Sequence, residues 1–205
     1  MACLVDFATG GTDEVGLFIR YDVNWEKLAQ GFQVTLGTEV CKLRAKLQKY
    51  GSPTGTIWLE IWTNNGGEPG SVIANGVSDT KDVSTISSTA TWYDLTFSTN
   101  PTLTKSTDYW LVLNGSWSVG TTNYVRCITS SVIASPGPFS YRTAPYSEWY
   151  DRGLSGEGGY GNLMIEVWTD HTTTNIKKVS GVEHASIKKI GGVAIGSVKK
   201  IAGVE

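Results

Sequence analysis

The sequence predicts an all-β fold: an antiparallel β-sandwich of jelly-roll-like topology, followed by a short β-type tail built from 11-residue repeats. Three observations support this prediction. Only 18% of the 205 residues are charged, whereas aromatic residues (11%) and glycines (24) are abundant, as in domains with many strands and turns. Short runs of alternating apolar and polar residues recur between Gly, Pro, Asn and Asp. No run with the periodicity of a long helix interrupts them.

The clearest strand is the segment 54–64, TGTIWLEIWTN. Its Ile and Leu residues alternate with Trp58, Glu60 and Trp62, so the two sets lie on opposite faces of a strand. Two tryptophans on one outer face are normally covered by a loop or by another subunit. The segment therefore predicts one buried face and one face with a partner.

The segment before it, 39–50, alternates in the same way, with Val40 out of step. The link 51–55, GSPTG, has the composition of a tight turn. We therefore predict that 39–50 and 54–64 form a β-hairpin.

Further strands and the domain boundary follow from the same reasoning. The last predicted strand closes at Trp168, and 170–175, DHTTTN, is a polar linker. We expect a sandwich domain over 1–169, the linker 170–175 and a repeat tail over 176–205. The other predicted strands lie within 14–23, 27–36, 71–76, 90–98, 108–115, 122–131 and 161–170.

The tail repeats the phrase I/V-K-K-I/V-x-G-V at intervals of 11 residues. Its glycines oppose a helix, and its paired lysines break the period of a plain strand, so short strand pieces with Gly corners are expected. Thirty residues cannot bury this apolar set alone, which predicts an assembly or attachment element; a flexible basic tail and a helix are the alternatives. The apolar positions are Ile176, Val179, Val182, Ile187, Ile190, Val193, Val198, Ile201 and Val204.

Charge is divided unevenly along the chain. Residues 171–205 hold six lysines and two glutamates, so the other 170 residues carry 11 of the 17 basic and 17 of the 19 acidic side chains. An acidic body with a basic tail can attract another copy of the chain or an acidic partner. The Lys pairs are isolated by Gly, Val and Ile, so no nucleic-acid partner is expected.

The three cysteines, Cys3, Cys41 and Cys127, give an odd count. Cys41 alternates in step with the apolar residues of 39–50, which predicts that it points into the core. Free buried thiols at Cys41 and Cys127 are one interpretation, and a bridge between these two is the other.

The N-terminus has no basic region followed by an apolar run, and no stretch of about 18 apolar residues occurs. We therefore expect no signal peptide and no membrane insertion, and synthesis in a cytoplasm.

No constellation predicts catalysis, a metal or a cofactor. His171 and His184 lie in the linker and the tail, so a histidine-based triad is not expected in the domain. The loops 63–70 and 150–161 could offer oxygen ligands to calcium but lack regular acidic spacing. We interpret the strand carboxylates as outward residues paired with Lys or Arg; these are Glu60, Asp94, Asp108 and Glu166.

The segment 140–160 combines aromatic and arginine side chains in a Gly-rich, strand-poor stretch. Three interpretations stay open: a loop whose rings plug the end of the core, a protein interface, or a glycan site on which rings stack. The candidate contact residues are Tyr141, Tyr146, Trp149, Tyr150 and Arg152.

The runs 30–76 and 91–115 resemble the β-sandwich domains of bacterial surface proteins and phage virion proteins, which are related to carbohydrate-binding jelly rolls. The matching pieces include GSPTGTIWLEIW, GGEPGSVIA and LTKSTDYWLVL. The terminal phrase resembles the K-I-x-G-V repeats appended to phage tail and other virion structural proteins.

The resemblance implies a non-enzymatic virion protein, either a capsid decoration or head fibre or a tail-associated protein. It would be homo-oligomeric and bound to other virion proteins. The alternative is a carbohydrate-binding module or adhesin that recognises host surface glycans.

Overall fold

The computed structural model describes most of the sandwich and four residue pairs of the tail. Ala2–His171 form one compact unit, and the tail belongs to a second. The described residues are 2–9, 17–19, 25–117, 122–130, 139–143, 149–151, 162–171, 178–179, 182–183, 189–190 and 193–194.

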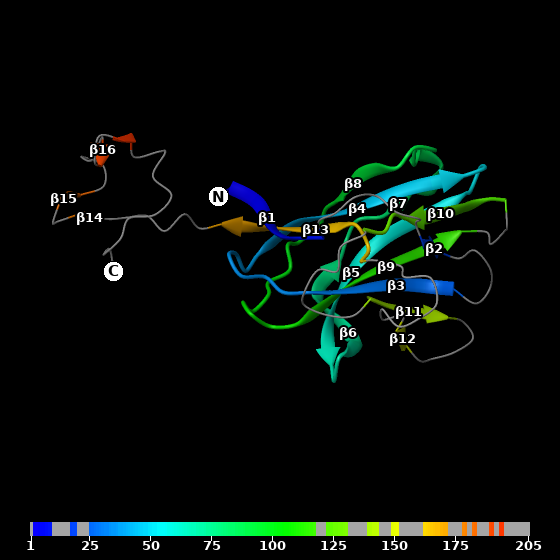
Figure 1. Ribbon diagram of the computed structural model, residues 1–205, viewed down its shortest axis with the longest axis horizontal. Helices are drawn as coiled ribbons and strands as arrows, with labels where there is room; N and C mark the ends of the chain where they lie inside the picture. The colour runs from blue at the N-terminus through cyan, green and yellow to red at the C-terminus, as the bar shows by residue number, and fades with distance from the viewer. Residues whose placement is uncertain are drawn as a thin grey trace. The chain divides into compact units, whose positions relative to one another are not determined.

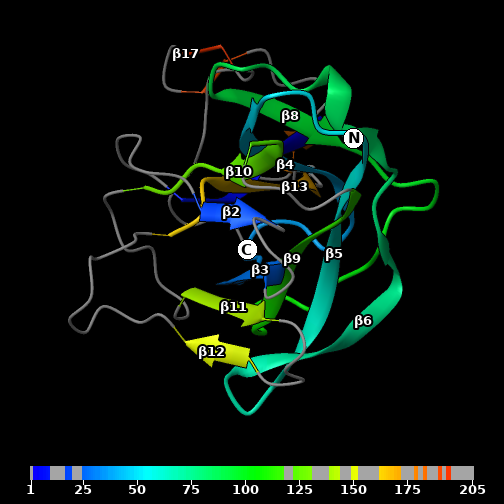
Figure 2. The same ribbon diagram turned by 90° about the vertical axis from the view of Figure 1, so that its right-hand side faces the viewer.

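Two antiparallel sheets pack face to face, which confirms the predicted β-sandwich (Figures 1 and 2). The described elements are strands, apart from one short 3-10 helix, η1 (Val83–Thr85). Among the described residues, no helix has the length and apolar character needed to span a membrane.

The first sheet has six strands. Five follow the order β1-β13-β4-β10-β2, and β8 pairs with β4. Their bounds are β1 (Ala2–Ala8), β2 (Leu17–Ile19), β4 (Val40–Tyr50), β8 (Thr91–Leu95), β10 (Tyr124–Cys127) and β13 (Ile165–His171).

The second sheet has seven strands. Six follow the order β12-β11-β3-β9-β5-β6, and β7 pairs with β5. Their bounds are β3 (Trp25–Phe32), β5 (Gly55–Asn65), β6 (Glu68–Val77), β7 (Lys81–Asp82), β9 (Tyr109–Trp117), β11 (Phe139–Thr143) and β12 (Trp149–Asp151).

Most successive strands alternate between the two sheets, so the chain crosses the sandwich repeatedly, as in a jelly roll. The predicted hairpin is wrong for this reason: β4 lies in the first sheet and β5 in the second. The link between them turns at Gly51, whose φ is +64°. A Cβ at Gly51 would lie 2.3 Å from the carbonyl oxygen of Thr122, so the link runs close against the neighbouring backbone.

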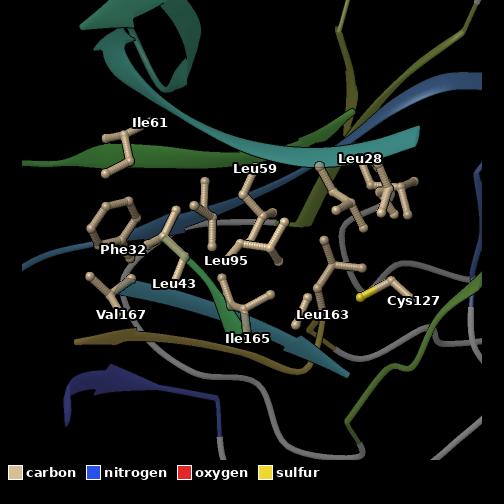
Figure 3. Close-up of a cluster of buried hydrophobic side chains, with 14 of the residues drawn as sticks. Leu28, Phe32, Leu43, Leu59, Ile61, Leu95, Cys127, Leu163, Ile165 and Val167 are labelled. Atoms are coloured by element: carbon tan, nitrogen blue, oxygen red, sulfur yellow. The ribbon is translucent and has the colours of Figure 1, made fainter. Parts of the chain in front are cut away.

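The core lies between the sheets, where strands such as β4 and β5 contribute alternate side chains (Figure 3). Leu43 and Leu47 of β4 face Leu59 and Ile61 of β5, and all four are fully buried. Burial of each such side chain stabilises the fold by about 1.5–3 kcal/mol. The free thiol of Cys127 lies in this core near Leu163.

The cysteine predictions need a correction, because Cys41 forms a disulfide with Cys3, 38 residues away. A β-bulge explains the error: the pairing of β13 with β4 shifts between Trp168 opposite Lys42 and Thr169 opposite Val40. The shift turns Val40 into the core, which accounts for its place out of step. Cys41 is therefore only half-buried and lies within reach of β1.

The carboxylate of Asp6 fixes β1 to the loop after β3. It accepts hydrogen bonds from the backbone amides of Thr35, Leu36 and Gly37 at 2.9–3.1 Å and from the hydroxyls of Thr35 and Thr169. Partial burial alone would raise the pKa of Asp6, but these hydrogen bonds outweigh it and lower the pKa. The disulfide and this carboxylate together hold the N-terminal edge strand.

The described residues of the tail form two strand pairs, one in each of the first two repeats, which confirms its β-type character. β14 (Lys178–Val179) pairs with β15 (Val182–Glu183), and β16 (Lys189–Ile190) pairs with β17 (Val193–Ala194). The two pairs lie 11 residues apart and have the same register. The sequence repeat is thus a structural repeat.

Candidate functional site

The outer face of the second sheet carries a cluster of tryptophan side chains. Trp58, Glu60 and Trp62 of β5 project from it, because their neighbours along the strand point into the core. Glu60 is only 9% exposed, whereas both indoles are half-buried. A carboxylate therefore sits between two tryptophans on the same face.

Glu60 fixes both rings by accepting their indole N–H groups. Trp58 Nε1 donates to Oε1 and Trp62 Nε1 donates to Oε2, both at 2.7 Å. Asn114 Nδ2 donates to Oε1 at 3.1 Å, and Lys27 Nζ lies 4.0 Å from Oε2. Because hydrogen bonds to a charged acceptor are strong, the orientation of both rings is set before any ligand arrives.

The two rings differ in what covers them. Lys27 Nζ lies 4.8 Å from the centroid of the Trp62 ring, and the Trp149 ring meets Trp62 edge-on at 6.0 Å and 87°. No cation or aromatic ring of the described residues lies against Trp58. Trp62 is thus enclosed, while Trp58 presents its ring outward.

A small second core lies below these rings. Ala29, Trp110 and Val112 are buried although they belong to the outer face, and Trp62 and Trp149 pack against them. The indole of Trp110 donates to Asn64 Oδ1 at 2.9 Å. This packing anchors Trp149 to the sheet.

An apolar rim borders the tryptophans on the edge strand β6. Val72 pairs with Trp62 and is 45% exposed, and Val77 pairs with Glu60 and is 48% exposed. Exposed valines beside an oriented indole extend the surface on which a flat ligand can rest.

The outer face of the first sheet repeats the carboxylate–indole arrangement. Trp168 Nε1 donates to Glu166 Oε2 at 2.8 Å, and Arg44 Nη1 also contacts that oxygen at 3.0 Å. Here cations cover the rings: Lys42 Nζ lies 4.1 Å from the Trp168 centroid, and Arg44 Cζ lies 5.3 Å from that of Trp92. In this network the cations of the chain itself cover both rings.

The four carboxylates expected to be outward, paired residues differ in their partners. Asp94 contacts Lys42 and Arg44, and Glu166 contacts Arg44. Glu60 pairs with Lys27 at 4.0 Å and also accepts hydrogen bonds from two indoles and an amide. Asp108 departs from the expectation, because the Gln33 amide binds it. Desolvation alone would raise the pKa of Asp94, but Lys42 and Arg44 lower it.

Of the predicted contact residues in 140–160, Trp149 is placed beside Trp62. Tyr141 and Tyr150 lie opposite each other in the pairing of β11 with β12, so this part of the segment forms strands rather than a loop. Tyr146 and Arg152 lie outside the described residues.

Some of the predicted assembly residues lie in the described strand pairs of the tail, and the others do not. Val179 lies opposite Val182, and Ile190 lies opposite Val193. Ile176, Ile187, Val198, Ile201 and Val204 lie outside the described residues.

No metal site emerges from the part of the chain that the structure describes, since no group of three His, Cys, Asp or Glu side chains gathers there. Complete burial raises the pKa of the Cys127 thiol to about 12, so it stays protonated at neutral pH.

Comparison with protein-family models, curated proteins and solved structures found no match to this chain. The resemblance to virion and carbohydrate-binding domains therefore stays a prediction.

Proposed function

We propose that this chain is a non-enzymatic structural protein of a bacteriophage virion, a capsid decoration (head fibre) or a tail-associated protein. The sandwich is displayed on the particle, and the repeat tail joins copies of the chain or anchors them to other virion proteins. The observation that carries the proposal is the repeated strand pair of the tail, which occurs in each of the first two repeats and in the same register.

The pairing supports assembly through its apolar positions. Val179 lies opposite Val182, and Ile190 lies opposite Val193, so each repeat brings two branched apolar residues together. An isolated pair of two-residue strands is too small to be stable in water. Such a pair gains stability when further copies stack on it, as in other repeat proteins.

Two further observations support display on a particle. The terminal phrase resembles repeats of virion structural proteins, and this resemblance carries the virion part of the proposal. The disulfide between Cys3 and Cys41 suits an oxidising exterior, such as a virion surface, to which the protein passes after synthesis in the host cytoplasm.

The assembly role is tested by deleting residues 172–205, a cut that leaves the pairing of His171 with Ala2 intact. We expect the full chain to be oligomeric and the truncated chain to be a folded monomer in size exclusion with light scattering. An oligomer of unchanged size after the deletion refutes the role of the tail.

A matched pair of variants locates the effect within the tail. Replacing Val179 and Ile190 with Ser should weaken assembly, whereas replacing Lys178 and Lys189 with Ser should leave the apolar pairs in place. Equal oligomers for both variants contradict an apolar assembly surface.

A second candidate function is recognition of host surface glycans, favoured by the arrangement around Glu60. Trp58 is half-buried, its ring is oriented by Glu60, and exposed Val77 lies opposite Glu60 on the neighbouring strand. Aromatic faces of this kind stack on the C–H faces of sugars. A glycan array should give signals that Trp58→Ala and Trp149→Ala reduce; an array without signals refutes this function.

A further inference from the structure

The outer faces of both sheets follow a common pattern, in which an indole ring is covered by a cation of the same chain. Lys27 covers Trp62, Lys42 covers Trp168, and Arg44 lies over Trp92. Within the described residues, Trp110 and Trp149 have no such cation but pack against other side chains in the small second core. Among the tryptophans whose side chains the structure describes, Trp58 has neither kind of cover. It lies on an outer face, half-buried, with no cation or ring of the described residues against it.

The surroundings of Glu60 make this difference specific. Its two oxygens each hold one indole N–H at 2.7 Å, so Trp58 and Trp62 are bound equivalently. The second neighbour of Oε2 is the ammonium group of Lys27, at 4.0 Å. The second neighbour of Oε1 is the neutral amide of Asn114, at 3.1 Å. A cation is present on one side of the carboxylate and replaced by an amide on the other.

Electrostatics favours a cation on the Trp58 side. The face of an indole attracts cations, and a neighbouring carboxylate strengthens the attraction. The sandwich as a whole contributes in the same direction, since the first 170 residues hold 17 acidic and 11 basic side chains.

The shape of the surface restricts the kind of cation. Because the Trp58 N–H is already bound to Glu60, a ligand meets the ring through its face. The exposed side chain of Val77, which lies opposite Glu60 on β6, adds an apolar surface on the same face. A lysine side chain offers a charge but no flat face, whereas an amino sugar offers both a protonated amine and a C–H face.

We propose that Trp58, Glu60 and Asn114 form a binding site for a glycan that carries free, protonated amino groups. This inference rests on the second proposed function, glycan recognition, and specifies its ligand class. Trp58 stacks on the sugar ring, and Glu60 holds the indole in place and attracts the amine. Because Asn114 is neutral, the position beside Trp58 is open to a cation of the ligand, whereas Lys27 fills the corresponding position beside Trp62.

The test compares two probes that share the same sugar backbone. Chitosan oligosaccharides carry free amines, and chitin oligosaccharides of the same length carry the N-acetyl groups that remove the charge. Titration of the full chain at mildly acid pH, followed by tryptophan fluorescence and calorimetry, should show tighter binding of the free amine by about 3- to 30-fold, the range of a cation–π contact. Equal binding of both oligosaccharides overturns the inference while leaving glycan recognition standing.

Variants assign the effect to the site. Trp58→Ala should remove the preference for the amine, and Asn114→Lys should remove it by placing a cation of the chain beside Trp58. Trp92→Ala is the matched control, because that half-buried ring is already covered by Arg44 and lies on the other sheet. Near-UV circular dichroism checks that each variant folds. Loss of the preference in Trp92→Ala, or its survival in Asn114→Lys, overturns the inference.

A lysine oligopeptide of similar charge forms the last arm. We expect it to bind more weakly than chitosan. If it binds as tightly, the site recognises cations without a sugar ring and the glycan assignment is overturned. If none of the three probes binds, the inference fails, and the glycan array decides separately on the second proposed function.

Discussion

The disulfide between Cys3 and Cys41 should make a large contribution to the stability of the sandwich. It joins residues 38 positions apart and ties the edge strand β1 to β4, with β13 between them. In the chain-entropy account, closing a loop of this length in the unfolded state is worth on the order of 4 kcal/mol. The Asp6 hydrogen bonds remain after the bridge is removed, so β1 should stay paired in the folded protein.

The test compares the urea unfolding midpoint of the Cys3→Ser variant with that of the wild type under oxidising conditions. With a typical slope of about 2 kcal/mol per molar urea, the midpoint should fall by about 2 M. A reductant should bring the wild type down to the level of the variant and leave the variant unchanged. Cys127→Ala is the control, because its response to reductant should match that of the wild type.

Two outcomes refute this reasoning. If the midpoint of Cys3→Ser falls by less than about 0.5 M, the bridge does not restrict the unfolded chain as the loop length requires. If Cys127→Ala loses the response to reductant, the bridge involves a different pair of cysteines.

Four further predictions concern single residues. Because the folded pKa of Asp6 is lowered from 3.8, its stabilising effect is complete above that value and is lost as the pH falls through the folded pKa. The difference in unfolding free energy between the wild type and Asp6→Asn should therefore shrink on acidification, and a constant difference contradicts it. Cys127 should react with a thiol reagent only in denaturant, and rapid labelling of the native protein contradicts its burial. Glu60→Ala should cost about 2–3 kcal/mol in urea unfolding, since it leaves two indole N–H groups and an amide without their acceptor; a loss below about 0.5 kcal/mol contradicts the arrangement. Gly37→Ala should lower the melting temperature, because its Cβ would lie 2.3 Å from Thr169 Oγ1 and 2.4 Å from a backbone oxygen; an unchanged melting temperature contradicts this close approach.

The sequence predicted where strands occur better than how they pair. Alternation located β4 and β5 well, because one face of each is buried and the other is not. It could not assign them to sheets, since the period of two is the same whether a link turns back or crosses the sandwich. β1 was missed because its Asp6 bulge disturbs the alternation, and the same kind of bulge at Val40 misplaced Cys41.

The candidate site was predictable in part. The pattern Trp58-x-Glu60-x-Trp62 places three side chains on one face of a strand, and this needs no partner strand. Lys27 and Asn114 could not be predicted, because they meet Glu60 only through the pairing of β3 with β9 and of β9 with β5. Hydrogen bonds between strands far apart in the sequence depend on register, which alternation alone leaves open.

The position of β13 has a consequence for the order in which the chain can fold during synthesis. β13 is the last strand of the sandwich to be made, yet it lies between β1 and β4, two strands from the N-terminal quarter of the chain. Until it arrives, β1 has no neighbour in the sheet, and the Asp6 hydrogen bonds to the loop after β3 are what hold it near β4. Such distant pairings make folding slow and leave unpaired strands exposed to aggregation.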